Sequence, residues 1–290
     1  MAQTLRSVLA AGEFVVAPGV FEMFSARLAD RMGFKALYMT GYGVSASHLG
    51  LADAGLITYR DMVDRARTIA QGTTTPLIAD ADTGFGGLLN VRETVRGYEA
   101  AGVQAIQIED QEVPKKCGHT PQRRVVPLAE AVKRVEVAVD ARKSDDFLVV
   151  ARTDARTGLG LDEAIMRARA FARAGADVLF VESPESETEF ARIGATLAGE
   201  AKLLANMVPT GRSPMLSAEK LKAFGFSIAI YPSAGMSAAC AALQSAYEFL
   251  QMHGSLEGCP VPAFAMQRLH ELVGFPDVWE FERRHAGPRD

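Results

Sequence analysis

Short apolar runs alternate with longer segments of helical periodicity along most of the chain. Eight of these runs are rich in Val, Ile, Leu and Ala with little polar alternation, which is typical of parallel strands buried on both faces. These runs span residues 14–20, 36–41, 76–82, 105–110, 147–154, 178–183, 202–207 and 227–232. We therefore expect a parallel sheet with both faces covered.

The segments between these runs repeat apolar residues at helical spacing. They span residues 21–32, 57–71, 90–102, 127–142, 161–175, 187–199, 217–225 and 236–254. Thr58 is suited to cap the second helix, and glycine ends several others, including Gly102, Gly175 and Gly225. Eight consecutive strand–helix units predict an α/β fold, a closed (β/α)8 barrel of the TIM type, in preference to an open doubly wound sheet. No Gly-x-Gly-x-x-Gly follows the first run, so a dinucleotide-binding fold has little support.

The tail has a different character from the barrel. Residues 259–264 read CPVPAF, and a helix-like stretch follows at 265–274. We expect residues 1–254 to form the barrel and residues 255–290 to form a C-terminal helical arm of the same domain. The arm can pack on a neighbouring barrel or on its own.

Polar residues cluster where the eight runs end. In a barrel these ends meet at one face, where active sites of this fold lie. The residues are Thr40, Gly41, Tyr42, Asp80, Asp82, Glu109, Arg152, Asp154, Glu182, Asn206, Tyr231, Pro232 and Ser233. So many carboxylates at one face would repel each other without a cation, and an all-oxygen ligand set favours Mg²⁺ or Mn²⁺ over zinc.

Several side chains of this ring suggest particular roles. Asp80 and Asp82 are two positions apart, so both would point to the same side of a strand; a cap or salt bridge is the alternative for this pair. Arg152 can bind a carboxylate with its fork of donors, and it can also pair with Asp154 or Glu182. Backbone N–H groups of residues 40–41 and 117–118 could hold further anionic oxygens, because the glycines permit close approach.

A basic loop at residues 114–124, PKKCGHTPQRR, follows the fourth strand. Cys117 lies beside Lys115 and Lys116 and two residues before His119, an arrangement that lowers a thiol pKa. The alternative is a solvated basic loop with an incidental cysteine. We expect Cys117 to be reactive.

Three separate motifs in order carry a family resemblance: IADADTGFGG at 78–87, KKCGH at 115–119 and ARTDA at 151–155. Together they resemble the isocitrate lyase/phosphoenolpyruvate mutase superfamily over most of the chain. The resemblance implies that the 114–124 loop closes over the site, that Cys117 delivers a proton, and that the last helices swap between subunits of a homodimer or homotetramer.

The resemblance also implies a metal site. Asp82 or Asp80 would bind Mg²⁺ directly, with Asp53 and Glu109 acting through water. Asp53, in GLADAG, can equally be an ordinary turn residue.

The lyase branch of this superfamily fits best, because its mutase and decarboxylase branches generally lack the loop cysteine. We expect cleavage of a 2-hydroxy dicarboxylate to a 2-oxo acid and a carboxylic acid. The candidate catalytic residues are Cys117, Lys115, His119 and Glu109. The candidate substrate-binding residues are Thr40, Gly41, Tyr42, Gly118, Arg152, Glu182, Asn206 and Pro232.

Departures from the resembled lyases bear on the substrate. Thr120 follows KKCGH where a longer side chain is usual, and Tyr42 replaces glycine-rich sequence and narrows the pocket. Ser237 stands where methylisocitrate lyase has an arginine for an extra carboxylate. This favours a substituted malate over a methylisocitrate-like tricarboxylate. Pro232 resembles the lyases where oxaloacetate hydrolases tend to have serine, although Ser233 is adjacent.

Parts of the sequence are also compatible with other functions. Oxaloacetate hydrolysis or decarboxylation and phosphonopyruvate-type mutase or hydrolase chemistry belong to the same superfamily. A phosphate-binding barrel enzyme would need a glycine-rich cup after strands seven and eight, of which PTGRSP and SAGM are weak versions. An inactive scaffold barrel would predict a broken acidic ring or a lost loop cysteine, and neither is found.

Composition limits the partners and the compartment. A net charge of −4 argues against a nucleic-acid partner, and no run is long enough to cross a membrane or to act as a signal peptide. Three cysteines give no paired framework and indicate a reducing compartment. We expect a cytoplasmic enzyme acting on a small carboxylate.

Overall fold

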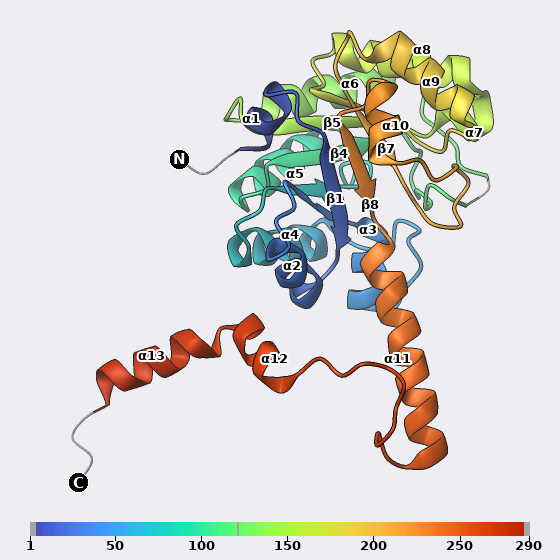
Figure 1. Ribbon diagram of the computed structural model, residues 1–290. Helices are drawn as coiled ribbons and strands as arrows, with labels where there is room; N and C mark the ends of the chain where they lie inside the picture. Colours follow the sequence, from blue (N-terminus) through green and yellow to red (C-terminus); the bar gives the residue numbers. More distant parts are fainter. Residues whose placement is uncertain (1–3, 121, 287–290) are drawn as a thin grey trace. The chain divides into compact units, whose positions relative to one another are not determined.

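The computed structural model describes residues 4–120 and 122–286, and within them the chain forms two compact units that meet at Met236 and Ser237. The first unit is a closed barrel of parallel strands in sequence order, with β1 pairing β8 (Figure 1). The strands are β1 (Val15–Val20), β2 (Leu37–Met39), β3 (Leu77–Asp80), β4 (Ala105–Glu109), β5 (Leu148–Thr153), β6 (Val178–Val181), β7 (Lys202–Asn206) and β8 (Ile228–Tyr231).

The predicted TIM-type barrel is therefore confirmed, and each expected strand is present. Most observed strands end one or two residues earlier than expected, because the polar residues after them turn out of the sheet. Asp82 is the clearest example, since its backbone has φ 48°. The expectation that Asp80 and Asp82 share one strand is wrong for Asp82.

Helices alternate with the strands around the barrel. They are α1 (Leu5–Ala10), α2 (Met23–Asp30), α3 (Gly41–Val44), η1 (Ser45–Leu49), α4 (Tyr59–Gly72), α5 (Leu88–Ala100), α6 (Leu128–Ala141), α7 (Ala155–Leu159), α8 (Leu161–Arg173), α9 (Glu187–Leu197) and α10 (Ala218–Ala223). Thr58 caps α4 as expected, with its side chain accepting the N–H of Asp61. Gly102 and Gly175 adopt the left-handed conformation after their helices, also as expected.

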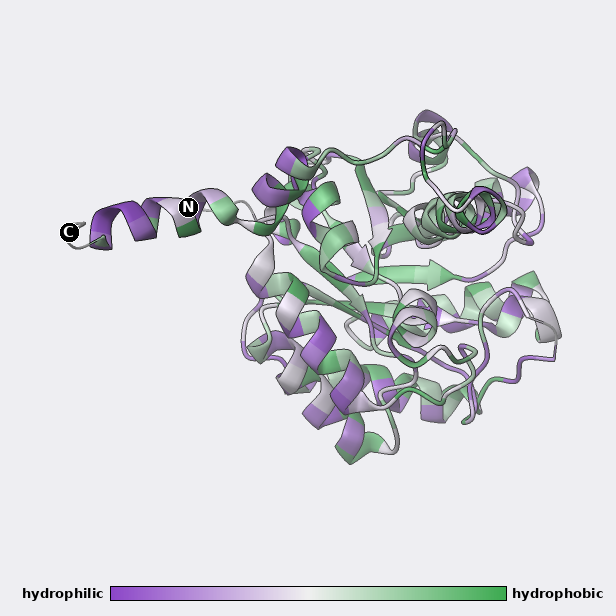
Figure 2. Ribbon diagram, turned by 90° about the horizontal axis from the view of Figure 1, so that it is seen from below, coloured by the Kyte–Doolittle hydropathy of each residue, from purple (hydrophilic) through white to green (hydrophobic). Residues whose placement is uncertain are grey.

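The barrel interior is a continuous apolar core. Alternate residues of the strands, such as Tyr38, Ile78, Val150 and Phe180, pack inside it together with Leu5 of α1. Figure 2 shows that the strands are largely hydrophobic and that the surrounding helices carry both hydrophobic and hydrophilic residues. This core closes the amino-terminal side of the strands, so the carboxyl ends are left for polar residues.

The second unit contains most of α11 (Ala234–His253), with α12 (Met266–Val273) and α13 (Phe275–His285). No residue of α11 or α13 is buried, and Leu272 is the buried residue of α12. The first compact unit ends at Met236, inside α11, and the expected division into a barrel of residues 1–254 and an arm stays a prediction. The assignment of 255–290 as an arm of the same domain stays a prediction. Across the described residues, no helix is long and apolar enough to pass through a membrane.

Candidate active site

The carboxyl ends of neighbouring strands bring the predicted acidic ring together. Asp80 ends β3 beside Gln107 of β4, and Glu109 ends β4 beside Arg152 of β5. These residues are buried, as are the further ring members Asp53, Asp82, Asp154, Glu182 and Asn206. The site is therefore a set of charges removed from water, where their mutual interactions are strong.

Asp82 returns to this ring although it lies beyond β3. Its N–H donates to Oδ1 of Asp80 at 3.0 Å. Gly41 fits against both aspartates, because a Cβ at this position would lie 2.7 Å from Asp80 Oδ2 and 3.4 Å from Asp82 Oδ1. The turn after β3 thus brings the carboxylates of Asp80 and Asp82 to the same side of the site, next to Gly41.

Lys115 supplies a cation to this part of the ring. Its ammonium contacts a carboxylate oxygen of Asp53 and lies 2.8 Å from Oδ1 of Asp82, with a side chain only 4% exposed. Burial alone would lower the pKa of Lys115, but Asp82 and Asp53 raise it well above its usual value. Burial raises the pKa of Asp82 to about 7 against the opposing effect of Lys115. The ammonium therefore lies among carboxylates that we expected to surround a metal ion.

The described residues contain no group of three His, Cys, Asp or Glu side chains already arranged around an ion. The donor set nevertheless fits a hard divalent cation. Burial raises the pKa of Asp80 and of Glu109, although nearby cations oppose it, and the ammonium of Lys115 lies 2.8 Å from Oδ1 of Asp82. Several buried carboxylate oxygens are thus gathered in one site, and such oxygens are ligands that Mg²⁺ prefers.

Arg152 is held on several sides by carboxylates. Its Nε and Nη2 donate to the two oxygens of Asp154, each at 2.9 Å, and Glu109 and Glu182 lie at 3.4 and 3.5 Å. Its guanidinium also lies over the Phe180 ring. Burial alone would raise the pKa of Asp154, but Arg152 lowers it below its usual value. Arg152 is thus a fixed cation at the centre of the ring, suited to hold a carboxylate.

The buried network behind Arg152 was not predicted from the sequence. Arg123 donates to Asp154 at 2.7 Å and also contacts the Thr157 hydroxyl. Asp110 accepts hydrogen bonds from Thr153 and from the backbone N–H of Asp154. The position of Arg123 at the end of the basic loop was the available signal for its role.

The basic loop lies on the ring. The N–H of Cys117 donates to the backbone oxygen of Asp53 at 3.0 Å, and Ser183 Oγ donates to the backbone oxygen of Gly118 at 3.0 Å. A Cβ at Gly118 would be 2.5 Å from Arg152 Nη2, so only glycine allows this approach. The loop and the strand ends therefore form one site.

The expected lowering of the Cys117 pKa is wrong. Burial raises the pKa of the thiol, the hydrogen bond with His119 only partly offsets this, and the ammonium of Lys115 is engaged with aspartates. Burial also lowers the pKa of His119, whose ring lies 3.4 Å from the Asn206 amide and 3.8 Å from Glu182. The raised pKa of Cys117 favours the protonated thiol, which is the form that can give up a proton.

The remaining predicted binding residues are less central. The N–H groups of Thr40, Gly41 and Cys117 already donate within the chain, to Val20, Asp80 and Asp53 respectively. Tyr42 is 45% exposed on α3. Pro232 follows β8, with its backbone against Gly19. The N–H groups of Thr40, Gly41 and Cys117 are therefore not free anion donors in this arrangement, whereas the expected anion-binding role of Gly118 stays a prediction.

A cavity of about 280 Å³ adjoins the acidic ring. Asp82 and Lys115 form its polar side, and Ile57, Phe85 and Val113 are among its apolar residues. A cavity next to buried carboxylates and a cation is a suitable place for a small polar ligand.

Known proteins are similar to this chain over nearly its full length. A family model described as phosphoenolpyruvate phosphomutase matches residues 5–251. The 2,3-dimethylmalate lyase of Eubacterium barkeri is 45% identical over 288 residues, 99% of each chain. A structure of oxaloacetate acetylhydrolase in complex with 3,3-difluorooxalacetate has a TM-score of 0.93 and 39% identity, covering 100% of this chain and 98% of that one.

A phosphonopyruvate hydrolase structure in complex with oxalate and Mg²⁺ has a TM-score of 0.88 and 30% identity, covering 98% of both chains. The barrel, the three motifs and these similarities agree. The chain belongs to the phosphoenolpyruvate mutase/isocitrate lyase superfamily.

Proposed function

We propose that this protein is a carbon–carbon lyase that cleaves a 2-hydroxy dicarboxylate, a substituted malate, into a 2-oxo acid and a carboxylic acid. The observation that carries the proposal is the position of Cys117 on a loop that packs over buried carboxylates and Arg152. Burial raises the pKa of this thiol, which favours the protonated form. The 45% identity to a 2,3-dimethylmalate lyase supports the same substrate class.

The proposed cofactor is Mg²⁺, with Mn²⁺ as the alternative. When bound, it supplies positive charge that stabilises negative charge developing on the oxygens of a 2-oxo acid. Asp80 or Asp82 would hold the ion directly, and Asp53 and Glu109 would hold it through water. A phosphonopyruvate hydrolase of the same superfamily contains Mg²⁺ together with oxalate, which supports this choice.

The protein's own side chains account for the remaining steps. Arg152 holds a substrate carboxylate, and Gly118 lets the loop approach it closely. A base, for which Glu109 is the candidate, takes the proton of the 2-hydroxyl group. The C2–C3 bond then breaks, its electron pair stays on C3, and the hydroxyl carbon becomes the oxo carbon. Cys117 protonates C3, and the thiolate regains a proton after product release.

Two neighbouring groups complete the candidate machinery. His119 and Asn206 lie together beside Glu182, and we propose that they shape the region where substrate meets the loop. Lys115 neutralises Asp53 and Asp82, so its position sets how much negative charge is left for a metal ion. Thr40, Gly41, Tyr42 and Pro232 are proposed to line the substrate side chain.

Oxaloacetate hydrolysis is the second candidate function. It is favoured by the similarity to oxaloacetate acetylhydrolase and by Ser233, which lies directly after Pro232. Both reactions break a carbon–carbon bond beside a 2-oxo or 2-hydroxy acid, and a substrate panel separates them.

The test is turnover of 2,3-dimethylmalate, 2-methylisocitrate, oxaloacetate and phosphonopyruvate with Mg²⁺ and with a chelator. We expect Mg²⁺-dependent release of a 2-oxo acid from a substituted malate. Cys117→Ser should lose at least a hundredfold in kcat, the usual loss when an acid–base group is removed, but keep oxalate affinity. The matched control is Cys240→Ser, an exposed cysteine. Phosphonopyruvate turnover without cleavage of any malate would reverse the assignment.

We also propose that the protein is a homodimer or homotetramer in which α11–α13 pack on a neighbouring copy. These helices carry many exposed apolar side chains, which soluble proteins usually cover. They include Leu243, Tyr247, Leu250, Met252, Met266, Phe275, Trp279 and Phe281. Light scattering should give a multiple of 31.1 kDa, and a monomer at micromolar concentration would contradict this. The three unpaired cysteines support a reducing, cytoplasmic location.

A further inference from the structure

The side chain of Gln111 joins the basic loop to the acidic ring. Gln111 lies two residues after the end of β4 and is 1% exposed. Its Nε2 donates to Oε1 of Glu109 at 2.9 Å and to the backbone oxygen of Lys116 at 2.8 Å. Its Oε1 accepts the N–H of Lys116 at 3.0 Å. One carboxamide thus binds both backbone groups of a loop residue and one carboxylate of the ring.

This contact needs a carboxamide of this length in this orientation. Both N–H bonds of the amide group are donated and its oxygen accepts, so turning the group over would place its oxygen against the oxygens of Glu109 and Lys116. A glutamate at position 111 would lack both donors, and an asparagine would be one methylene shorter. The chemistry of the contact is therefore particular to glutamine.

The backbone of Gln111 is fixed independently of this contact. Its backbone oxygen accepts a hydrogen bond at 2.9 Å from Arg134 of α6, a side chain that is itself buried. Gln111 also pairs in antiparallel fashion with Val125, which directly follows the basic loop. Lys116, in contrast, is an exposed residue next to Cys117. Gln111 is thus the anchored partner, and Lys116 is the partner that moves away when the loop opens.

The carboxylate of Glu109 is held from two directions. Gln111 donates to its Oε1, and Nε of Arg152 lies 3.4 Å from its Oε2, a longer contact than the 2.9 Å bond from Arg152 to Asp154. If Lys116 moves away, the carboxamide loses two of its three hydrogen bonds and is free to turn. Oε1 of Glu109 then loses a fixed donor. Loop closure and the orientation of Glu109 are therefore linked through one side chain.

We propose that Gln111 is a positioning residue that fastens the closed loop at Lys116 and at the same time orients Glu109, the candidate base. The proposal rests on the proposed function for the role of Glu109 in the reaction. Its consequence is that the base takes its working orientation only when the loop that carries Cys117 is closed.

The first test is the rate at which trypsin cleaves the full-length protein after Lys116, identified by mass spectrometry. Cleavage requires the backbone of Lys116 to leave Gln111, so the rate reports how often the loop opens. Gln111→Met keeps the length of the side chain but removes both hydrogen bonds to the loop, and cleavage should be about tenfold faster. Gln111→Glu is the second variant. It keeps one of the three hydrogen bonds and adds charge beside Glu109, so its cleavage should also be faster.

The second test is a double-mutant cycle on kcat for cleavage of a substituted malate. Gln111→Met should lower kcat about tenfold, because it removes a hydrogen bond to a charged group. In a Glu109→Ala background, the same substitution should lower the remaining kcat by less than threefold, since the carboxylate that Gln111 orients is gone. A residue that only supports the fold would lower kcat equally in both backgrounds.

The cycle can also be measured without turnover. Coupling between two groups is reciprocal, so Glu109→Ala should itself speed trypsin cleavage after Lys116, and the double variant should be cleaved no faster than Gln111→Met. A substrate panel without any turnover would therefore count against the proposed function and not against the role of Gln111.

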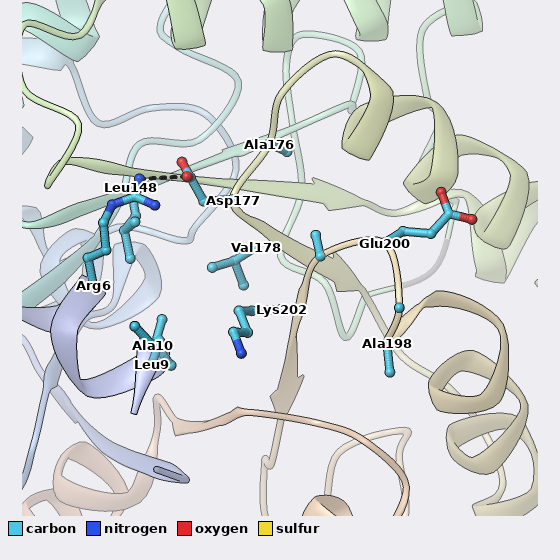
Figure 3. Close-up of a pocket in the computed structure, with 12 residues that line it drawn as sticks. Arg6, Leu9, Ala10, Leu148, Ala176, Asp177, Val178, Ala198, Glu200 and Lys202 are labelled. Carbon is cyan, nitrogen blue, oxygen red and sulfur yellow. Dashed lines mark hydrogen bonds and ion pairs between the residues drawn. The ribbon is translucent and has the colours of Figure 1, made fainter. Parts of the chain in front are cut away.

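The matched control is Gln104→Met, at the other end of the same strand. The side chain of Gln104 accepts the N–H of Leu5 at 2.8 Å. Leu5 precedes Arg6, whose ion pair with Asp177 is shown in Figure 3. Gln104→Met also removes a hydrogen bond between a glutamine and the backbone, but far from the loop, so it should leave kcat and the trypsin rate within twofold.

Three results would overturn the proposal. An unchanged trypsin rate in both Gln111 variants would show that Gln111 does not fasten the loop. Additive effects of Gln111→Met and Glu109→Ala, on kcat or on the trypsin rate, would show that Gln111 does not act through Glu109. Effects of Gln104→Met equal to those of Gln111→Met would reduce both to a general loss of stability.

Discussion

Arg123 connects the basic loop to the residues that hold Arg152, and its removal should be costly. Its side chain has no exposed area, and it donates to Asp154 at 2.7 Å and contacts the Thr157 hydroxyl. Breaking a buried ion pair by removing one partner costs about 3–5 kcal/mol. Asp154 would keep its two hydrogen bonds from Arg152, so we expect Arg123→Met to cost about 3 kcal/mol.

The next residue supplies a matched control. Arg124 is 81% exposed and pairs with Glu112 at the surface, where such pairs contribute about 0–1 kcal/mol. Urea unfolding of Arg123→Met and Arg124→Met at one protein concentration compares the two losses directly. A difference below about 1 kcal/mol would refute the reasoning that Arg123 is a buried anchor. If the anchor also orients Arg152, oxalate affinity should fall in Arg123→Met and not in Arg124→Met.

Two further predictions concern loop closure and acid stability. Gly118→Ala places a Cβ 2.5 Å from Arg152 Nη2, so the closed loop should carry an overpacking penalty of about 1–3 kcal/mol and the enzyme should lose turnover. The control is Gly87→Ala, whose Cβ meets no atom within 4 Å and which should leave turnover unchanged in the same steady-state assay. Burial tends to raise the pKa of Asp30, but hydrogen bonds from Thr75 lower it below its usual value. The ionised form of Asp30 is thus favoured in the folded state. Above a pH of about 4, the free energy of unfolding of wild type should therefore exceed that of Asp30→Asn, and this difference should disappear as the pH falls through the folded-state pKa. Unfolding measured as a function of pH checks this. A difference in free energy of unfolding that is unchanged at pH 3 would contradict this.

The barrel was accessible from sequence because its signal is local. Apolar runs such as 147–151 are typically buried between two layers, and eight of them in alternation with helices are compatible with few folds. The same logic placed Asp80, Glu109 and Arg152 at one face, since parallel strands end together. The predicted ends of the strands were less accurate. An aspartate such as Asp82 does not indicate from its side chain that its backbone is left-handed and leaves the sheet.

Ion pairs between residues that are distant in the sequence could not be predicted from the sequence. Lys115 was expected to act on Cys117 two positions away, but its ammonium reaches Asp53 and Asp82 instead. Arg123 and Asp154 are far apart in sequence and meet only when the loop folds onto β5. Burial of Cys117 reversed the expected pKa direction for the same reason, because burial is a property of the assembled site.

The central claim is that a divalent ion and a 2-oxo acid are held by the carboxyl ends of the strands beneath Cys117. Anomalous diffraction from crystals grown with Mn²⁺ and oxalate tests it most directly. We expect the Mn²⁺ peak next to Asp80 or Asp82, with oxalate between the ion and Arg152 and the Cys117 loop over both. A Mn²⁺ peak away from these aspartates, or oxalate bound without contact to Arg152, would contradict the claim.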